Sequence, residues 1–233
     1  MEIARDKLKT LFDVALLRAT TTAADVEDFA KTAQEEHLSQ ICVNTVHIAR
    51  AVAALRGTSV KVVAPIGFPM GITKTEVKVC EAEHAVTEGA AELDMVLNLG
   101  AFFDGDFKAT EADIRAIVSV ASGRLVKVII ETPVLNDEQK VNASRLVQEA
   151  GASFVKTCTG FSPEPLALYE DVRLIRQAVG PTMGVKASGR VGSYLRCMAM
   201  LEAGANRIGL SLEQARAILN GWDAHHGTQH GSR

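Results

Sequence analysis

The stretch Ser153-Phe-Val-Lys-Thr-Cys-Thr-Gly160 is a short β-like run that carries a lysine near its end and stops at a glycine. The stretch Met183-Gly-Val-Lys-Ala-Ser-Gly189 has the same pattern farther along the chain. A helix-like segment follows each run, so we expect two neighbouring parallel strands with Lys156 and Lys186 at their carboxyl ends. In α/β proteins this end of the strands is where binding and catalytic sites are built.

The same alternation of β-like and helix-like segments extends over most of the chain. Eight β-like runs follow one another without a linker: Val14–Arg18, Gln40–Asn44, Lys61–Ile66, Glu92–Asn98, Val126–Thr132, Ser153–Thr157, Met183–Ala187 and Arg207–Leu210. Eight such units predict an α/β fold, a single-domain TIM (β/α)8 barrel over residues 1–222. An open doubly wound sheet is the second architecture, but it favours a GxGxxG fingerprint after the first strand, and none is present.

Local signals mark where the helices should begin and end. Thr22-Ala-Ala-Asp25 and Thr73-Lys-Thr-Glu76 resemble capping boxes, and Asn136 is a candidate cap before two acidic residues. Glycines that suit a left-handed residue after a helix stand at Gly89, Gly151 and Gly204. Residues 223–233 contain His225, His226 and His230 among glycine and polar residues, and we expect a disordered polar tail there.

Composition restricts the class of protein. The chain has 233 residues, of which 47% are hydrophobic and 23% charged, so it can bury one sizeable core. Its net charge of −3 makes nucleic acid and anionic membranes poor partners. No apolar stretch is long enough to cross a bilayer and the first residues lack the apolar core of a signal peptide, so we expect a cytoplasmic protein. The four cysteines are far apart in sequence and form no CxxC, which argues against disulfides, and we expect no metal or cofactor.

The lysine pair indicates a specific chemistry. Two ammonium groups held close together lower each other's pKa, which is how a lysine becomes a neutral nucleophile near pH 7. Strand alternation puts Asp94 on one face with Val96 and Asn98, where its carboxylate reaches the pair if that face is the inner one. The alternatives are a solvated or snorkelling lysine at each position and a surface aspartate at 94.

Lys127 and Glu131 lie on one face of another run by the same alternation. They are candidates for a structural ion pair that supports the site.

At these residues the chain resembles the deoxyribose-phosphate aldolase family, class I aldolases with a TIM-barrel fold. The matching segments run in the family's order over residues 13–211: Cys42-Val-Asn44, Ile66-Gly-Phe-Pro69, Glu92-Leu-Asp-Met-Val-Leu-Asn98, Val126-Lys-Val-Ile-Ile-Glu-Thr132, Phe154-Val-Lys-Thr-Cys-Thr-Gly160 and Gly184-Val-Lys-Ala-Ser-Gly189. The resemblance implies reversible cleavage of 2-deoxy-D-ribose 5-phosphate to D-glyceraldehyde 3-phosphate and acetaldehyde, without a metal or cofactor. It implies small sugar phosphates and aldehydes as partners, and we add a homodimer as an expectation.

The resemblance also implies residue roles. Lys156 forms the Schiff base, Lys186 keeps Lys156 neutral, and Lys186 and Asp94 share a proton relay. Asp13 is a lesser acidic partner, and Cys42 is a bystander thiol beside the pocket. The remaining residues expected around the substrate and its phosphate are Thr159, Gly160, Gly189, Arg190, Gly209 and Ser211.

The sequence departs from the family pattern where phosphate is held. Arg190 stands at the second position of the family's Gly-Gly pair, and Gly209-Leu-Ser-Leu-Glu213 replaces Gly-Thr-Ser-Ser-Gly. Leu212 removes a hydroxyl, Glu213 adds a negative charge at a helix start, and Arg190 offers a compensating phosphate clamp. These departures leave open a lysine aldolase that prefers unphosphorylated or other aldehydes.

Overall fold

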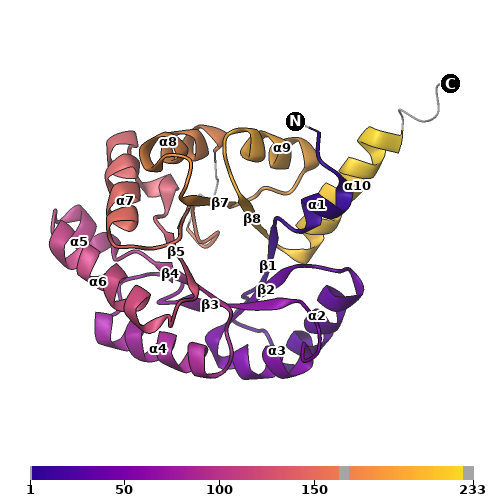
Figure 1. The fold of residues 1–233 in the computed structure, drawn as a ribbon, viewed down its shortest axis with the longest axis horizontal. Coiled ribbons are helices and arrows are strands. Elements are labelled where there is room, and N and C mark those ends of the chain that lie inside the picture. The colour runs from indigo at the N-terminus through magenta and orange to yellow at the C-terminus, as the bar shows by residue number, and fades with distance from the viewer. Residues whose placement is uncertain (1, 163–167, 228–233) are drawn as a thin grey trace.

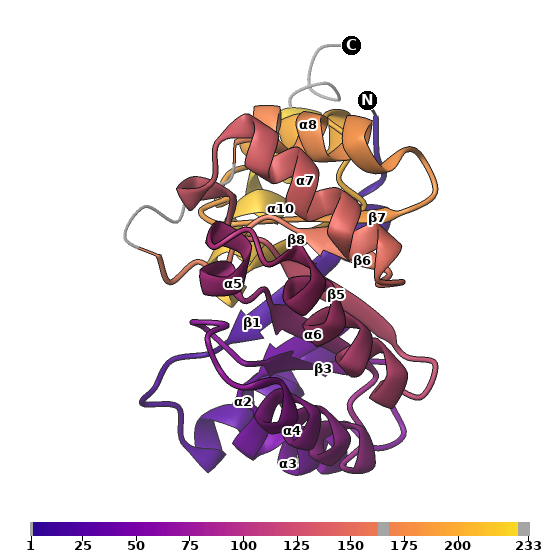
Figure 2. The ribbon, with the colours of Figure 1, turned by 90° about the vertical axis from the view of Figure 1, so that its left-hand side faces the viewer.

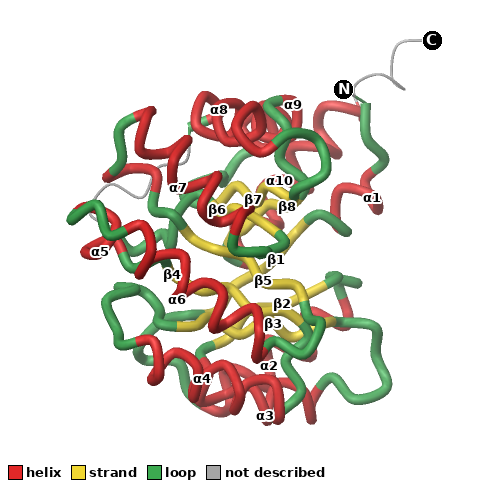
Figure 3. Tube along the Cα trace, turned by 60° about the vertical axis from the view of Figure 1, so that its left-hand side comes forward, coloured by secondary structure: helices red, strands yellow, loops and turns green. Residues whose placement is uncertain are grey.

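Eight parallel strands pair in sequence order and close on themselves, with the last strand pairing with the first. The computed structural model describes residues 2–162 and 168–227. Figure 1 looks into the ring of strands, and Figure 3 shows the strands inside and the helices around them. The predicted (β/α)8 barrel is confirmed. Its strands are β1 (Phe12–Leu16), β2 (Gln40–Val43), β3 (Lys61–Ile66), β4 (Glu92–Val96), β5 (Leu125–Ile129), β6 (Phe154–Lys156), β7 (Gly184–Ser188) and β8 (Arg207–Leu210).

The helices form the outer layer, which Figure 2 shows from the side. They are α1 (Arg5–Lys9), α2 (Ala23–Glu35), α3 (Ile48–Ala54), α4 (Thr75–Thr87), α5 (Leu99–Phe103), α6 (Phe107–Val120), α7 (Asp137–Glu149), α8 (Tyr169–Val179), α9 (Tyr194–Glu202) and α10 (Leu212–Gly227), with short 3-10 turns η1 (Thr45–His47) and η2 (Thr132–Val134). None of the helices in the described part of the chain has the length and apolarity needed to cross a membrane.

The two faces of each strand carry different side chains. In β4, Leu93 and Met95 are fully buried members of the hydrophobic core, while Asp94 between them is ion-paired to lysines of other strands. Apolar residues therefore pack outward against helices, and the barrel interior holds charged groups. This is the alternation that places polar side chains on the inner face.

Most of the helix signals read from the sequence are confirmed. Thr22 begins α2 with a capping box, since its hydroxyl accepts from the Asp25 amide at 3.2 Å and its amide donates to the Asp25 carboxylate at 2.7 Å. Asn136 caps α7 in the same way with Gln139. The glycines after α4, α7 and α9 adopt φ of 101°, 83° and 111°, as expected of left-handed residues: Gly89, Gly151 and Gly204.

Two local predictions are wrong. The Thr73 box does not form, because α4 begins at Thr75 and its N-cap, Lys74, makes no side-chain cap. The tail predicted from residue 223 is helical as far as Gly227, because α10 continues through it. Trp222 anchors this end by donating to the Ile3 carbonyl at 2.8 Å, and the His226 ring stacks on the Trp222 ring at 4.0 Å. Residues 228–233, which include His230, lie outside the described residues.

Candidate active site

A cavity of about 370 Å³ opens at the carboxyl ends of the strands. Its lining contains residues expected from the sequence, namely Asp13, Cys42, Lys156, Thr159, Gly160, Lys186, Gly189, Arg190, Gly209 and Ser211. It also contains Ser188, which flanks Lys186 in the second motif, and Ala15, Leu17, Arg18, Phe161, Leu210 and Gln214, which sequence reasoning missed. The barrel thus brings the expected residues other than Asp94 into one lining, and Asp94 contacts the two lysines of that lining. Their individual roles stay predictions.

Both lysines of the opening motifs bond to a single carboxylate oxygen. Lys156 Nζ lies 2.8 Å and Lys186 Nζ 2.7 Å from Oδ2 of Asp94. Lys186 also donates to Oδ2 of Asp13. All four side chains are almost completely buried, so these contacts are little screened by solvent.

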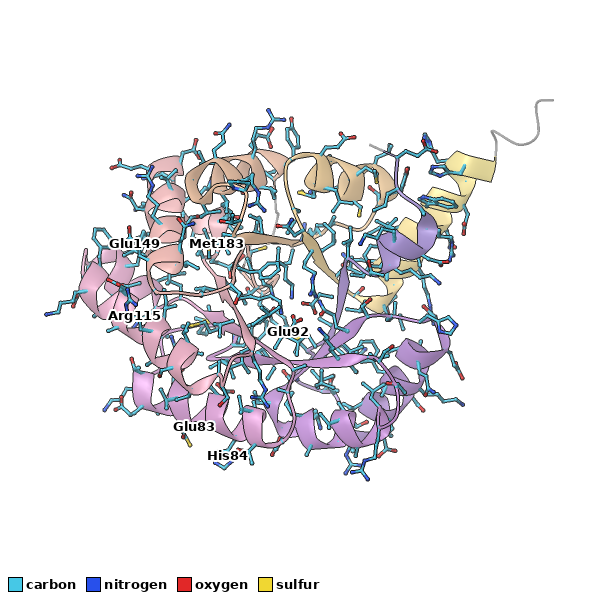
Figure 4. The ribbon with its side chains drawn as sticks, viewed as in Figure 1. Glu83, His84, Glu92, Arg115, Glu149 and Met183 are labelled. Atoms are coloured by element: carbon cyan, nitrogen blue, oxygen red, sulfur yellow. The ribbon has the colours of Figure 1, made fainter. Side chains whose placement is uncertain are left out.

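A third lysine lies beneath this pair, inside the barrel. Lys127 Nζ is 2.7 Å from Oδ1 of Asp94, 2.7 Å from Oε2 of Glu92 and 3.6 Å from Asp13. Figure 4 places Glu92 within the ring of strands. The suggested pairing of Lys127 with Glu131 is therefore wrong. β5 ends at Ile129, and Glu131 adopts φ 58° and accepts from the Thr159 amide at 3.1 Å.

A glycine makes room for the Lys186 side chain. A Cβ at Gly209 would come within 2.7 Å of the Ser188 Cβ and 3.1 Å of the Lys186 Cε. A larger residue on β8 would therefore push Lys186 away from Asp94 and Asp13.

Side-chain bonds tie the ends of β6 and β7 together. The Thr157 hydroxyl donates to the Ser188 carbonyl at 2.8 Å and accepts from the Ser188 amide at 2.9 Å, and the Ser188 hydroxyl donates to the Cys158 carbonyl at 2.5 Å. These bonds fix the two strands that carry Lys156 and Lys186. Alternation from Lys156 would put Cys158 on the same inner face, but β6 ends at Lys156. The Cys158 thiol contacts the Ser188 carbonyl and does not line the pocket.

Asn98 also departs from the expected alternation. β4 ends at Val96, and the Asn98 side chain accepts from the Ala101 amide at 3.2 Å to cap α5. The face shared by Asp94 and Val96 therefore does not extend to residue 98.

The charges of the cluster shift each other's protonation. Burial would raise the pKa of Asp94, but the Lys127, Lys156 and Lys186 ammonium groups hold it well below its ordinary value. Burial lowers the pKa of Lys186, and the nearby carboxylates do not fully offset that effect. For Lys156, burial also acts downward, but the electrostatic interactions with Asp94, Cys42 and Asp13 and the hydrogen bond to Asp94 together outweigh it and leave the pKa above its ordinary value.

Asp94 lies between the two ammonium groups and accepts from both. The expectation that Lys186 keeps Lys156 neutral stays a prediction. Lys186 is the member of the pair whose pKa is lowered, and it reaches Lys156 through one shared oxygen. A Lys186 amine that has lost its proton can accept one from Lys156 through Asp94 without changing the charge of the cluster.

The thiol in the pocket is protonated at neutral pH. Burial raises the pKa of Cys42 to about 12, and Asp94 and Asp13 add to that effect. Thiolates, and not thiols, are the effective nucleophiles. Cys42 therefore fits the bystander role implied by the resemblance.

The mouth of the pocket carries two arginines. Arg190 is exposed and adopts φ 53°, a left-handed conformation that costs a residue other than glycine about 1–2 kcal/mol. Arg18 lines the mouth, two positions after β1 ends. A basic residue just after a strand was the only feature of the sequence that could have pointed to it.

Ser211 and Gln214 form a capping box at the start of α10. The Ser211 amide donates to the Gln214 side chain at 3.0 Å, and the Gln214 amide donates to the Ser211 hydroxyl at 3.3 Å. The Ser-x-x-Gln spacing would have predicted this pair.

Two residues expected at the phosphate end lie elsewhere. Leu212 and Glu213 line a neighbouring cavity beside α2 and are absent from the lining of the described pocket. The Ser211 hydroxyl lowers the pKa of Glu213. This cavity shares Ala15, Leu17, Arg18 and Ser211 with the lysine pocket, so Glu213 lies next to that pocket without lining it.

Within residues 2–162 and 168–227, no three His, Cys, Asp or Glu side chains are grouped as metal ligands. The cluster can supply a neutral amine, a carboxylate and a second amine within hydrogen-bond reach of one another, which suits addition to a carbonyl and transfer of protons.

Comparison with known proteins agrees with this chemistry. Residues 8–213 match the sequence model described as DeoC/LacD family aldolase. A deoxyribose-phosphate aldolase of Streptococcus sanguinis is 46% identical over 218 residues, which cover 94% of this chain and 98% of that protein. Among solved structures, one described as QR15, an aldolase, has a TM-score of 0.88 and 36% identity over 95% of this chain and 98% of its own. The tetrameric deoxyribose phosphate aldolase of Aeropyrum pernix has a TM-score of 0.87 and 29% identity over 95% and 93% of the two chains.

Proposed function

This chain belongs to the DeoC/LacD family of aldolases, and from that membership and the lysine pocket we propose that it cleaves 2-deoxy-D-ribose 5-phosphate reversibly to D-glyceraldehyde 3-phosphate and acetaldehyde. As a family member it is an enzyme of the lyase class, acting on a carbon–carbon bond. The observation that carries the proposal is the sharing of Asp94 Oδ2 by the amines of Lys156 and Lys186.

Lys156 is the proposed nucleophile. It lines the pocket and is not in contact with Asp13, whereas Lys186 is held by both Asp13 and Asp94. Transfer of its proton through Asp94 to Lys186 leaves Lys156 neutral. The neutral amine adds to C1 of the open-chain sugar, and loss of water gives a protonated imine on Lys156.

The imine then accepts the electrons of the bond that breaks. Removal of the proton on the C3 hydroxyl lets the C2–C3 bond cleave, which releases D-glyceraldehyde 3-phosphate and leaves an enamine on Lys156. Protonation at C2 and addition of water return acetaldehyde and the free amine. Asp94 and Lys186 are the groups proposed to move these protons, because they lie within hydrogen-bond distance of Lys156 or of its partner oxygen.

Arg190 is the proposed main contact for the phosphate. It is exposed at the pocket mouth, and its left-handed backbone is strained, which is typical of a residue retained for its side chain. The amides of Gly160, Gly189 and Gly209 and the hydroxyl of Ser211 line the same pocket and can donate to phosphate oxygens.

The alternative substrate class, unphosphorylated aldehydes, rested on Leu212 and Glu213. Both line the neighbouring cavity, so the pocket itself gives little support to that reading. A homodimer also stays a prediction for this chain.

Cleavage of deoxyribose with and without its 5-phosphate tests the proposed substrate. We expect kcat/KM to be larger for the phosphorylated sugar by about 100-fold or more, as two charge-assisted contacts of about 1.5 kcal/mol each would give. Equal values for the two sugars would contradict phosphate recognition while leaving the lysine chemistry untouched.

A further inference from the structure

A second cavity, of about 730 Å³, opens at the opposite end of the barrel from the lysine pocket. Three of its lining residues, Gln40, Lys61 and Arg207, are the first residues of β2, β3 and β8. It is therefore at the amino ends of the strands, where TIM barrels usually keep residues for stability and not for binding. The cavity is not part of the proposed catalytic reaction.

The lining of this cavity is rich in hydrogen-bond donors and positive charge. Lys61 and Arg207 contribute cations, and Thr58 and Ser59 contribute hydroxyls. In the part of the chain that the structure describes, no aspartate or glutamate lines it. A concave surface of this composition favours an anion.

Two of the donors are buried and have no protein acceptor within the described residues. Gln40 is 1% exposed, and its Nε2 has no hydrogen-bond partner there. The Arg207 side chain is 18% exposed, but its Nη1 atom is buried and also has no partner. A buried donor without a partner costs about 1–3 kcal/mol, so these two groups call for an acceptor from outside the chain.

Glu92 fixes Arg207 without cancelling the positive charge of the cavity. Its Oε1 is 3.3 Å from Nη2 of Arg207 and 4.0 Å from Nζ of Lys61, while its Oε2 is closer to Lys127, at 2.7 Å. One carboxylate thus faces both cations of the cavity, and Lys127, which it also contacts, is shared with Asp94 and Asp13. The Arg207 guanidinium also lies over the Phe154 ring, 5.8 Å from its centre, so Nη1 is held in place before any ligand arrives.

We propose that this cavity binds a small oxyanion, inorganic phosphate or a phosphate monoester, through Gln40, Lys61 and Arg207. The donors come from three strands and a loop, which suits the several oxygens of a phosphate better than a single carboxylate. The site is distinct from the phosphate contact proposed at the pocket mouth, and it does not depend on the proposed catalytic function.

Titration calorimetry with inorganic phosphate tests the site. Binding is measured in the Arg190→Ala protein, which lacks the proposed mouth contact, with chloride at matched ionic strength as the blank. We expect saturable binding of one phosphate, weakened about tenfold or more when Lys61→Met removes a charge-assisted contact. Lys61 is 56% exposed at its side chain, so this change should leave folding intact. Gln40→Leu, which removes the buried donor, should weaken binding further, and circular dichroism checks that the variant is folded.

Two results would overturn the site. In one, the heat with phosphate equals that with chloride. In the other, binding persists in Arg190→Ala and is the same with and without Lys61→Met, which places the anion elsewhere. Loss of all binding in Arg190→Ala alone would also contradict the proposal, because the mouth would then be the place where phosphate binds.

Discussion

Replacing Lys186 by leucine should move the pH dependence of the proposed reaction. Lys156 and Lys186 lie 2.8 and 2.7 Å from the same oxygen, so their nitrogens are at most about 5.5 Å apart. At an effective dielectric constant of about 20, two positive charges at that separation repel by about 3 kcal/mol, or about two pKa units. This repulsion lowers the pKa for loss of the first proton from the lysine pair. Lys186→Leu removes the repulsion.

The sign of the change follows from the chemistry. Only a neutral amine adds to a carbonyl, so activity rises as the pH increases through the amine's pKa. In Lys186→Leu the remaining amine, Lys156, keeps Asp94 as partner and loses its repelling neighbour, so the acidic limb of kcat/KM against pH should move upward by about two units. At pH 7 the neutral fraction falls about 100-fold, and loss of proton transfer lowers the rate further.

Two further variants separate charge from proton transfer. Lys186→Arg keeps a positive charge but cannot lose a proton, so it should hold the acidic limb near its wild-type position while kcat falls. Lys140→Leu removes a lysine of α7 that pairs with Asp171 at 2.8 Å, outside the barrel, and should leave the profile unchanged. An unshifted limb with near-normal turnover in Lys186→Leu would refute the coupling of the two lysines.

Three other changes have defined outcomes. Arg190→Ala should raise KM for the phosphorylated sugar about tenfold or more, through loss of a charge-assisted contact, and hardly change cleavage of unphosphorylated deoxyribose; equal responses of both sugars would make Arg190 structural. Glu213→Gln should alter the preference between the two sugars by less than about twofold, because Glu213 lines the neighbouring cavity and its charge is partly screened. A tenfold change would mean that the Glu213 charge acts on the bound phosphate. Iodoacetamide at pH 8 should modify the exposed Cys80 before Cys42, because the pKa of Cys42 is raised to about 12. Peptide mass mapping measures the order of labelling, and early labelling of Cys42 would contradict its protonated state.

The fold and the lysine pair were accessible from the sequence because both depend on local periodicity. β-like runs that alternate with helical segments predict the barrel. Alternation within β4, β6 and β7 tells which residues share a face with Asp94, Lys156 and Lys186, and that face is the inner one if the mouth of the barrel is a site. The prediction fails where a strand ends sooner than its apolar run suggests. Glu131 and Cys158 lie beyond the ends of β5 and β6, so alternation no longer sets their direction.

Groupings that depend on several distant strands were not accessible in the same way. Lys127 contacts residues of β1 and β4 at once, and the register among these strands brings the groups together. The donors at the amino ends of β2, β3 and β8 are separated by long stretches of sequence and carry no motif. The positions of Leu212 and Glu213 depend on where α10 begins, and in the structure both line the cavity that adjoins the lysine pocket.

The central claim is that Lys156 forms a covalent imine with the substrate. Borohydride reduction in the presence of acetaldehyde, followed by peptide mass mapping, tests it most directly, because reduction converts the imine to a stable ethyl-lysine. We expect one added ethyl group, located on Lys156, and none in a Lys156→Ala protein whose fold is confirmed by circular dichroism. An ethyl group on Lys186 instead, or on neither lysine, would contradict the account.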